Sequence, residues 1–77
     1  MGDRCDYLLV PDSERAFKAA ERLKRYGDVQ VSPPAEESRQ WVVSLKTRLN
    51  ETPPLGMLAG IAEALGGEYG GSEMKDG

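Results

Sequence analysis

The chain has 77 residues, 39% of them hydrophobic, and a formal net charge of −3, a composition typical of one small globular domain. It contains one cysteine, Cys5, and no histidine, which excludes an intramolecular disulfide and histidine-based catalysis and argues against a zinc site. With neither a signal-like segment nor an apolar run near the roughly 20 residues that span a bilayer, we expect a cytoplasmic protein, residues 1–77 forming a single domain.

The first predicted elements are a strand and an amphipathic helix. Residues 6–10, Asp-Tyr-Leu-Leu-Val, form a short apolar run that predicts a strand in the centre of a sheet. Asp12 or Ser13 is then placed to cap a helix. Its apolar residues Ala16, Ala20 and Leu23 recur at i, i+4 and i+7, with Phe17 beside them. We expect Gly27 to end this helix as a left-handed residue.

Two further strands are predicted from alternation of polar and apolar residues. Residues 28–32 alternate in this way, and Pro33-Pro34 stops the strand because proline cannot donate to a sheet ladder. Residues 39–49 give the longest strand pattern in the chain. One face of this strand is predicted to carry Trp41, Val43, Leu45, Thr47 and Leu49, and the other Val42, Ser44, Lys46 and Arg48.

A second helix and a final strand complete the chain. Thr52 is the expected N-cap of the helix, with Pro53 at its first position and Gly66 just past its end. Its core stripe consists of Leu55, Leu58, Ala62 and Leu65. Residues 68–74 are expected to form a short, glycine-rich strand, and residues 75–77 a frayed tail.

The order of these elements predicts an α+β fold of the ferredoxin-like βαββαβ kind. This is an antiparallel four-stranded sheet with two helices on one face. The apolar first and third strands are expected in the centre and the polar second and fourth strands at the edges. The other face of the sheet is then left open to solvent or to a partner.

The glycine-rich stretch from Gly66 to Gly71 follows a helix rather than a strand, so it does not fit a phosphate-binding loop. We interpret it as a helix C-cap that leads into an edge strand. Tyr7 and Trp41 invite comparison with RNA-recognition modules, which stack bases on aromatics of the same two strands. The third strand lacks the basic-glycine-aromatic run of those modules, and the net charge of −3 also argues against a nucleic-acid binder.

Several stretches of the chain resemble the ribonuclease E inhibitor family, also called regulator of ribonuclease activity B. These are the tryptophan-led strand RQWVVSLKTRL, the helix LGMLAGIAEALGGEY that follows a proline-containing link, and the turn from this helix into the last strand. This turn, called the corner below, carries Gly66, Gly67, Glu68, Tyr69 and Gly71. The residues of the resemblance are Trp41, Gly66, Gly67, Glu68, Tyr69 and Gly71. The resemblance implies a ferredoxin-like domain that has no catalytic activity, binds the endonuclease and lowers RNA cleavage.

Our first hypothesis is therefore that the chain is a non-enzymatic protein-interaction module without a metal or cofactor. Its partner would be a protein, such as an endoribonuclease, and the module itself a monomer or weak homodimer. The expected binding residues are Tyr7, Lys46 and Arg48 on the open sheet face, with Glu68 and Tyr69 at the corner. Alternatives are a ligand-sensing domain of the amino-acid-binding (ACT-like) kind, which would dimerise, and a weak RNA-binding module.

Overall fold

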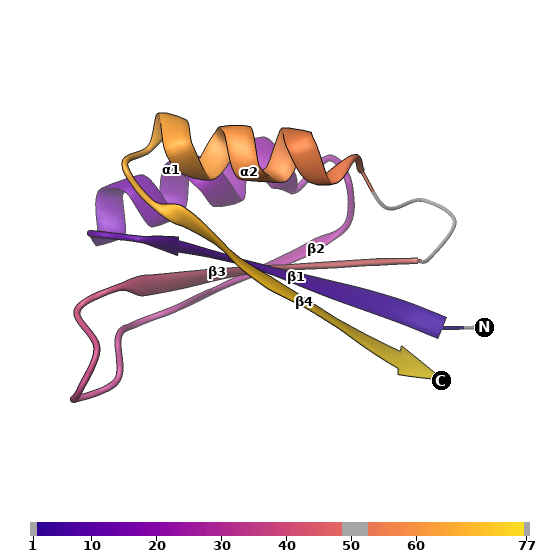
Figure 1. Ribbon diagram of the computed structural model, residues 1–77, viewed down its shortest axis with the longest axis horizontal. Helices are drawn as coiled ribbons and strands as arrows, with labels where there is room; N and C mark the ends of the chain where they lie inside the picture. Colours follow the sequence, from indigo (N-terminus) through magenta and orange to yellow (C-terminus); the bar gives the residue numbers. More distant parts are fainter. Residues whose placement is uncertain (1, 49–52, 77) are drawn as a thin grey trace.

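The computed structural model describes residues 2–48 and 53–76. The elements in chain order are β1 (Gly2–Val10), α1 (Ser13–Leu23), β2 (Asp28–Ser32), β3 (Trp41–Arg48), α2 (Leu55–Ala64) and β4 (Glu68–Asp76). The strands form one antiparallel sheet in the order β2-β3-β1-β4, so the apolar strands are central and the others lie at the edges, as predicted. Both helices lie on one face of this sheet, and neither residues 2–48 nor residues 53–76 cover the opposite face (Figure 1).

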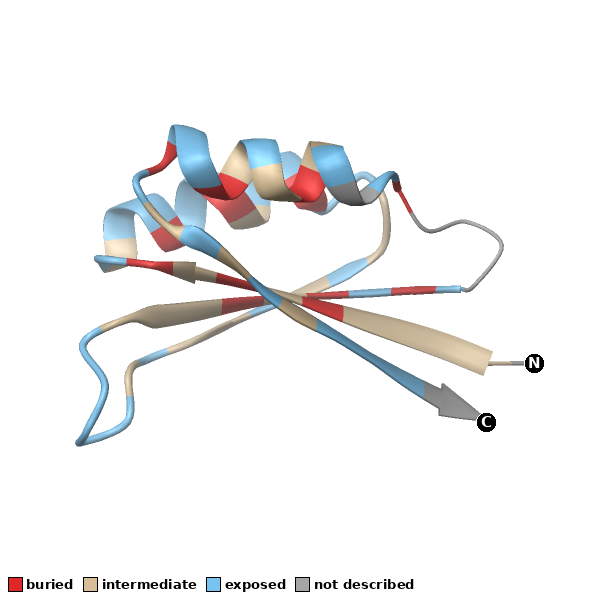
Figure 2. Cartoon of the chain, in the orientation of Figure 1, coloured by how far each residue is buried: buried red, intermediate tan, exposed pale blue. Residues whose placement is uncertain are grey.

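The hydrophobic core lies between the helices and the sheet (Figure 2). Alternation along β1 and β3 sends one set of side chains toward the helices. The fully buried members of the core are Leu8, Val10, Ala16, Ala19, Leu23, Val43, Leu45, Leu58 and Ala62. The predicted inward face of β3 is therefore confirmed at Val43, Leu45 and Thr47, whereas Leu49 lies outside the described residues.

The central strand β1 is longer than the sequence pattern predicts, because it begins at Gly2 rather than at Asp6. The added segment, Gly-Asp-Arg-Cys, has no strand-like alternation of its own. It is held by neighbours on both sides, since Asp3 pairs with Arg48 of β3 and with Lys75 of β4. Tertiary pairing thus overrides local propensity here.

Helix α1 is capped by Asp12, whose side chain accepts a hydrogen bond of 2.9 Å from the backbone N–H of Arg15. The helix ends at Leu23, with Lys24 as its C-cap, so the expectation that Gly27 terminates it was wrong. Gly27 does not have a positive φ. It is instead pressed against β3, where an added Cβ would overlap the carbonyl oxygen of Lys46. Glycine therefore permits the close approach of two backbones at the start of β2.

Helix α2 begins at Leu55 with Pro54 as its N-cap, rather than with Pro53 at its first position. Pro53 is buried instead, and the predicted cap Thr52 lies outside the described residues. Two hydrogen bonds close the other end of the helix: Gly66 N–H donates to the Glu63 carbonyl (3.0 Å) and Gly67 N–H to the Ala62 carbonyl (2.8 Å).

These two bonds form a Schellman motif, in which Gly66 has a φ of 72° and Leu65 is the C-cap. The predicted role of Gly66 is therefore confirmed. Gly67 has a separate reason for being glycine, because a Cβ there would overlap the carbonyl oxygen of Leu9 in β1. The chain thus turns from α2 into β4 with its backbone packed directly against the central strand.

Strand β4 runs through Asp76, so Lys75 and Asp76 pair with β1 and do not form the expected frayed tail; residue 77 is outside the described part. A β-bulge interrupts the pairing, since Tyr7 faces Gly71 while the next residue, Leu8, faces Tyr69. Gly71 has a φ of 104°, a conformation that residues with a Cβ rarely adopt. The glycines of β4 thus build the bulge.

Candidate functional site: the open sheet face

The candidate site is the sheet surface that faces away from the helices, called the open face below. Its position follows from alternation, because the neighbours of its residues along each strand are buried under the helices. It is formed by Asp3, Cys5, Tyr7 and Leu9 of β1, Asp28 and Gln30 of β2, Val42, Ser44, Lys46 and Arg48 of β3, and Glu68 and Glu73 of β4. These side chains are half-buried or exposed.

Tyr7 lies near the centre of the open face, in a row of small or flexible neighbours. Ser44 is its partner on β3 and Gly71 its partner on β4, and Gln30 follows Ser44 across the sheet. The Tyr7 hydroxyl donates a hydrogen bond of 2.9 Å to the Glu73 carboxylate. This bond raises the pKa of Tyr7, because an ionised phenolate would lie beside a negative charge.

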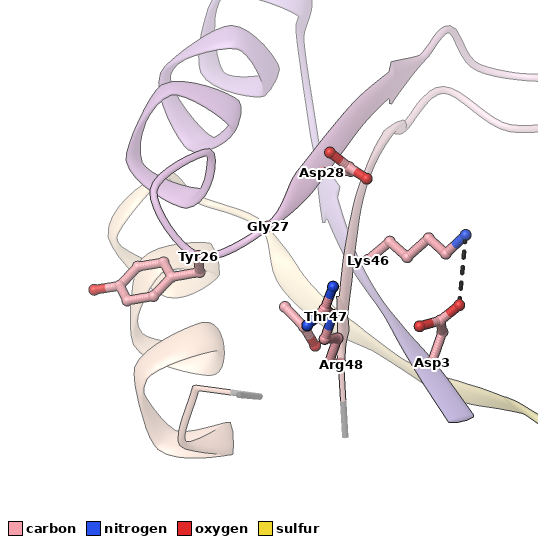
Figure 3. A pocket seen from close by; sticks show the side chains of 7 residues that line it. All are labelled: Asp3, Tyr26, Gly27, Asp28, Lys46, Thr47 and Arg48. Atoms are coloured by element: carbon pink, nitrogen blue, oxygen red, sulfur yellow. Dashed lines mark ion pairs between the residues drawn. The ribbon is translucent and has the colours of Figure 1, made fainter. Parts of the chain in front are cut away.

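Lys46 occupies the next row, between Asp28 of β2 and Cys5 of β1. Its ammonium lies 3.7 Å from the Asp3 carboxylate, on the side of the sheet away from the helices (Figure 3). It borders two shallow hollows. One, of about 280 Å³, is lined by Asp3, Tyr26, Gly27, Asp28, Lys46, Thr47 and Arg48; the other, of about 320 Å³, by Cys5, Asp28, Val29, Gln30, Ser44 and Lys46.

The charges of the open face have a simple arrangement. The cations Lys46 and Arg48 belong to β3, and carboxylates lie on the other three strands: Asp28 on β2, Asp3 on β1, and Glu68 and Glu73 on β4. The ion pair of Lys46 with Asp3 is more than 40% exposed on both sides, so it contributes little to stability and is easily exchanged for a pair with another molecule. The open face therefore offers exchangeable charges of both signs around one aromatic ring.

The two predicted corner residues point to different faces. Glu68 is exposed and pairs with Leu9 on the open face. Tyr69 pairs with Leu8, packs against the hydrophobic core and donates a 2.6 Å hydrogen bond to Asp6 Oδ1. The structure therefore brings Tyr7, Lys46, Arg48 and Glu68 to one surface and places Tyr69 on the other side of the sheet.

Tyr69 belongs to a polar cluster that the sequence did not indicate. Asp6 is only 1% exposed and accepts hydrogen bonds at Oδ1 from Tyr69 and from Arg4 Nε (3.1 Å). Its other oxygen, Oδ2, is buried without a hydrogen-bond partner in the described part of the chain. The interaction of the Arg4 guanidinium with the Tyr69 hydroxyl oxygen, together with the nearby Asp6 carboxylate, raises the pKa of Arg4 and outweighs the opposing effect of burial. A separation of 63 residues between Asp6 and Tyr69 hides this contact from local sequence patterns.

The other residues of the resemblance have structural positions. Trp41 is half-buried and packs against the core, Gly66 and Gly67 form the C-cap of α2, and Gly71 lies in the bulge of β4. Gly66 and Gly67 form the corner that precedes Tyr69, and the bulge at Gly71 follows it. They set the path of β4 and hence the position of Glu68 and Glu73 on the open face.

Across residues 2–48 and 53–76, no group of three or more Cys, Asp or Glu side chains is arranged to hold a metal ion. The same residues contain no helix with the length and apolar character needed to cross a membrane. Comparison of the chain with protein-family models, curated proteins and solved structures gave no match.

Proposed function

We propose that this chain is a non-catalytic protein-interaction module that docks a partner on the open face. The observation that carries the proposal is the unequal coverage of the sheet: α1 and α2 lie on one face, and no described helix covers the other (Figure 1). On that second face Tyr7 is half-buried and Lys46 is exposed. A surface that combines an aromatic ring, small polar groups and charges of both signs is typical of non-obligate protein interfaces.

The fold that we propose is ferredoxin-like. Two observations support it: the β-α-β-β-α-β order of elements and the β2-β3-β1-β4 order of strands in the sheet. Many unrelated functions use this architecture, so the fold alone does not select a partner. The selection has to come from the side chains of the open face.

The partner that we propose is an endoribonuclease of the ribonuclease E type. This part of the proposal rests on the resemblance of the strand at Trp41 and of the corner between Gly66 and Gly71. In the structure, Gly66, Gly67 and Gly71 of this corner have conformations or close contacts that require glycine. In this account the module occupies a surface of the nuclease, lowers RNA cleavage and takes no part in bond breaking.

Charge on the open face favours a protein partner over RNA. The hydroxyl of Tyr7 is already bound to the Glu73 carboxylate, and Glu68 places a second carboxylate on the same strand. RNA phosphates that followed a base stacked on Tyr7 would meet these negative charges. A folded protein can instead present a cation to β4 and a carboxylate to β3.

The test is a binding measurement between the purified module and a purified ribonuclease E-type endonuclease, followed by an RNA-cleavage assay. We expect wild-type module to bind and to slow cleavage. Lys46→Glu should weaken binding by about tenfold or more, because a reversed charge adds repulsion to the lost attraction. The matched control is Lys18→Glu, which reverses an exposed cation on the outer side of α1.

Three outcomes would contradict the proposal. The first is that no complex forms and cleavage is unchanged. The second is that Lys46→Glu and Lys18→Glu weaken binding equally, which would indicate general electrostatic attraction rather than docking on the open face. The third is a stable homodimer that binds a small metabolite and no nuclease, which would favour the ligand-sensing alternative.

A further inference from the structure

The two edges of the sheet are built differently. β4 carries a bulge, two consecutive glycines and the exposed carboxylates Glu68 and Glu73, all features that keep an edge strand from pairing with another chain. β2 has no bulge, glycine, lysine or proline, and its five residues pair with β3 in unbroken register. Its single charged residue is Asp28, at the first position. The outer side of β2 is therefore a regular strand edge, and no strand in the described part of the chain lies along it.

The sequence of β2, Asp-Val-Gln-Val-Ser, is suited to antiparallel pairing with itself. When two copies of the strand are paired about Gln30, Asp28 lies opposite Ser32, Val29 lies opposite Val31, and Gln30 lies opposite its own copy. Each of the five residues then has a partner, apolar residues meet apolar residues, and no like charges are opposed. A two-fold axis through the central pair generates this arrangement, and two-fold symmetry is the commonest symmetry of homodimers.

Alternation along β2 places the two kinds of pair on different faces. Val29 and Val31 are half-buried and pack against the hydrophobic core, on the helix side of the sheet, whereas Gln30 between them is exposed on the open face. A two-fold axis perpendicular to the sheet keeps the helices of both copies on the same side. The paired valines would therefore form an apolar strip below the two copies of α1.

Helix α1 is placed to pack against its own copy in this arrangement. It contacts both β2 and β3, so it lies over the boundary between these two strands. Because neighbouring strands are about 4.8 Å apart, the axes of the two copies of α1 would be separated by two strand spacings, or about 10 Å. Packed helices have interaxial distances of about 8 to 10 Å. The pairing of the strands thus brings the helices into contact without moving either of them on its own sheet.

A groove of about 610 Å³ between α1 and β2 shows what this contact would bury. It is lined by Phe17, Ala20, Glu21 and Lys24 of the helix and by residues 27–29. The side chain of Phe17 is 61% exposed, although its neighbour Ala16 is fully buried, so the packing of α1 on its own sheet does not depend on Phe17. An aromatic ring exposed at a groove is suited to bury an apolar group of another molecule.

The charges of the groove do not oppose the meeting of two copies. The helix contributes one carboxylate, Glu21, and one ammonium, Lys24, so it presents no field of a single sign to its copy. The carboxylate of Asp28 would lie opposite Ser32 of the second copy, whose hydroxyl can donate a hydrogen bond to it. An interface of one short strand and one helix side is small, so we expect a reversible dimer with a dissociation constant in the micromolar range.

We propose that the chain forms a symmetric homodimer, in which β2 pairs antiparallel with β2 of a second copy and Phe17 of each copy packs over the paired valines. The product is one continuous antiparallel sheet of eight strands, four from each copy, with all helices on one face. The interface uses the edge of the sheet rather than its open face. The proposal therefore stands or falls independently of docking on a nuclease.

Sedimentation equilibrium of the full chain, at concentrations from micromolar to millimolar, measures the dimer. Phe17→Ala removes apolar contact, and Gln30→Lys places two ammonium groups opposite each other at the two-fold axis. Each should weaken dimerisation by about tenfold or more. The matched control is Met74→Ala, which truncates the other exposed large hydrophobic residue of the described chain, on β4, and should leave dimerisation unchanged. All three residues are exposed, so the variants should fold, which circular dichroism checks.

Cross-linking tests the register of the strands. Cys5 is the only cysteine, so Cys5→Ser gives a background without thiols. In that background Gln30→Cys places two thiols opposite each other, where Cβ atoms are about 4.5 to 5.5 Å apart, close to the geometry of a disulfide. Oxidised glutathione should then produce a covalent dimer of Gln30→Cys but not of Ser72→Cys, which is exposed on the other edge strand.

Three results would overturn the proposal. The first is a chain that stays monomeric at millimolar concentration, which would leave the edge of β2 to a different partner. The second is a dimer that is weakened by Met74→Ala and unaffected by Phe17→Ala and Gln30→Lys. The third is equal cross-linking of the two cysteine variants, which would indicate random collision rather than strand pairing.

Discussion

Replacement of Tyr69 by Phe isolates one hydrogen bond in the buried polar cluster. The ring remains in place against the core, and only the hydroxyl that donates to Asp6 Oδ1 over 2.6 Å is removed. Asp6 is 1% exposed and its Oδ2 already has no hydrogen-bond partner in the described residues. Water cannot easily replace the lost donor, so the carboxylate keeps only its contact with Arg4.

The expected cost follows from the charge and burial of the acceptor. A hydrogen bond to a charged group contributes about 1.5 to 3 kcal/mol. A domain of this length has a free energy of unfolding of about 4 to 12 kcal/mol, so the loss is a large fraction of the total. With a urea m-value of about 1 kcal/mol per M, the unfolding midpoint should fall by about 1.5 to 3 M.

Urea unfolding can be followed by the fluorescence of Trp41, the single tryptophan of the chain, which is half-buried against the core. The matched control is Tyr7→Phe, which removes a hydroxyl from an exposed hydrogen bond to Glu73 on the opposite face. We expect that control to cost about 0.5 kcal/mol or less. If Tyr69→Phe were no more destabilising than Tyr7→Phe, the reasoning about the buried carboxylate would be refuted.

Two further predictions concern backbone contact and pH. Gly67→Ala should destabilise the fold by about 3 kcal/mol or more, because its Cβ would overlap the Leu9 carbonyl oxygen. Gly56→Ala lies on an open helix surface and should stabilise the fold by up to about 1 kcal/mol. Equal urea midpoints for the two variants would contradict this prediction. The hydrogen bond to Glu73 raises the pKa of Tyr7 above its ordinary value of about 10, so the stability it gives is fully present below that pH and is lost as the pH rises through the folded-state pKa. Above pH 10, the urea midpoint of Tyr7→Phe should therefore fall less steeply with pH than the midpoint of the wild type. If the two midpoints fell in parallel, ionisation of Tyr7 would not contribute to the pH dependence of stability.

Elements with a strong local pattern were predictable from the sequence. The alternation of β3 identified its buried face at Val43 and Leu45, and Gly66 was identified as the residue that ends α2 because no other residue type tolerates that conformation as well. The true role of Gly27, which allows β2 to approach the backbone of β3 and does not end α1, was not predictable in this way. Its reason is the backbone of β3, which is distant in the sequence.

The part of the candidate site that depends on strand alternation was also predictable from the sequence. Strand alternation was enough to place Tyr7, Lys46 and Arg48 on one surface. Glu68 and Tyr69 are consecutive residues of β4, so alternation alone sends them to opposite faces. The partner of the Tyr69 hydroxyl was not predictable in this way, because it is a carboxylate near the other end of the chain. A polar side chain such as Asp6 in an apolar run was the one signal that could have pointed to a buried partner.

Docking on the open face can be followed residue by residue through amide chemical shifts. Isotope-labelled module is titrated with the purified ribonuclease E-type endonuclease, and the shifts of each amide are followed. We expect changes concentrated at open-face residues, with Tyr7, Ser44, Lys46 and Glu73 among the largest and the outer side of α1 unaffected. An absence of change, or changes confined to α1 and α2, would contradict it.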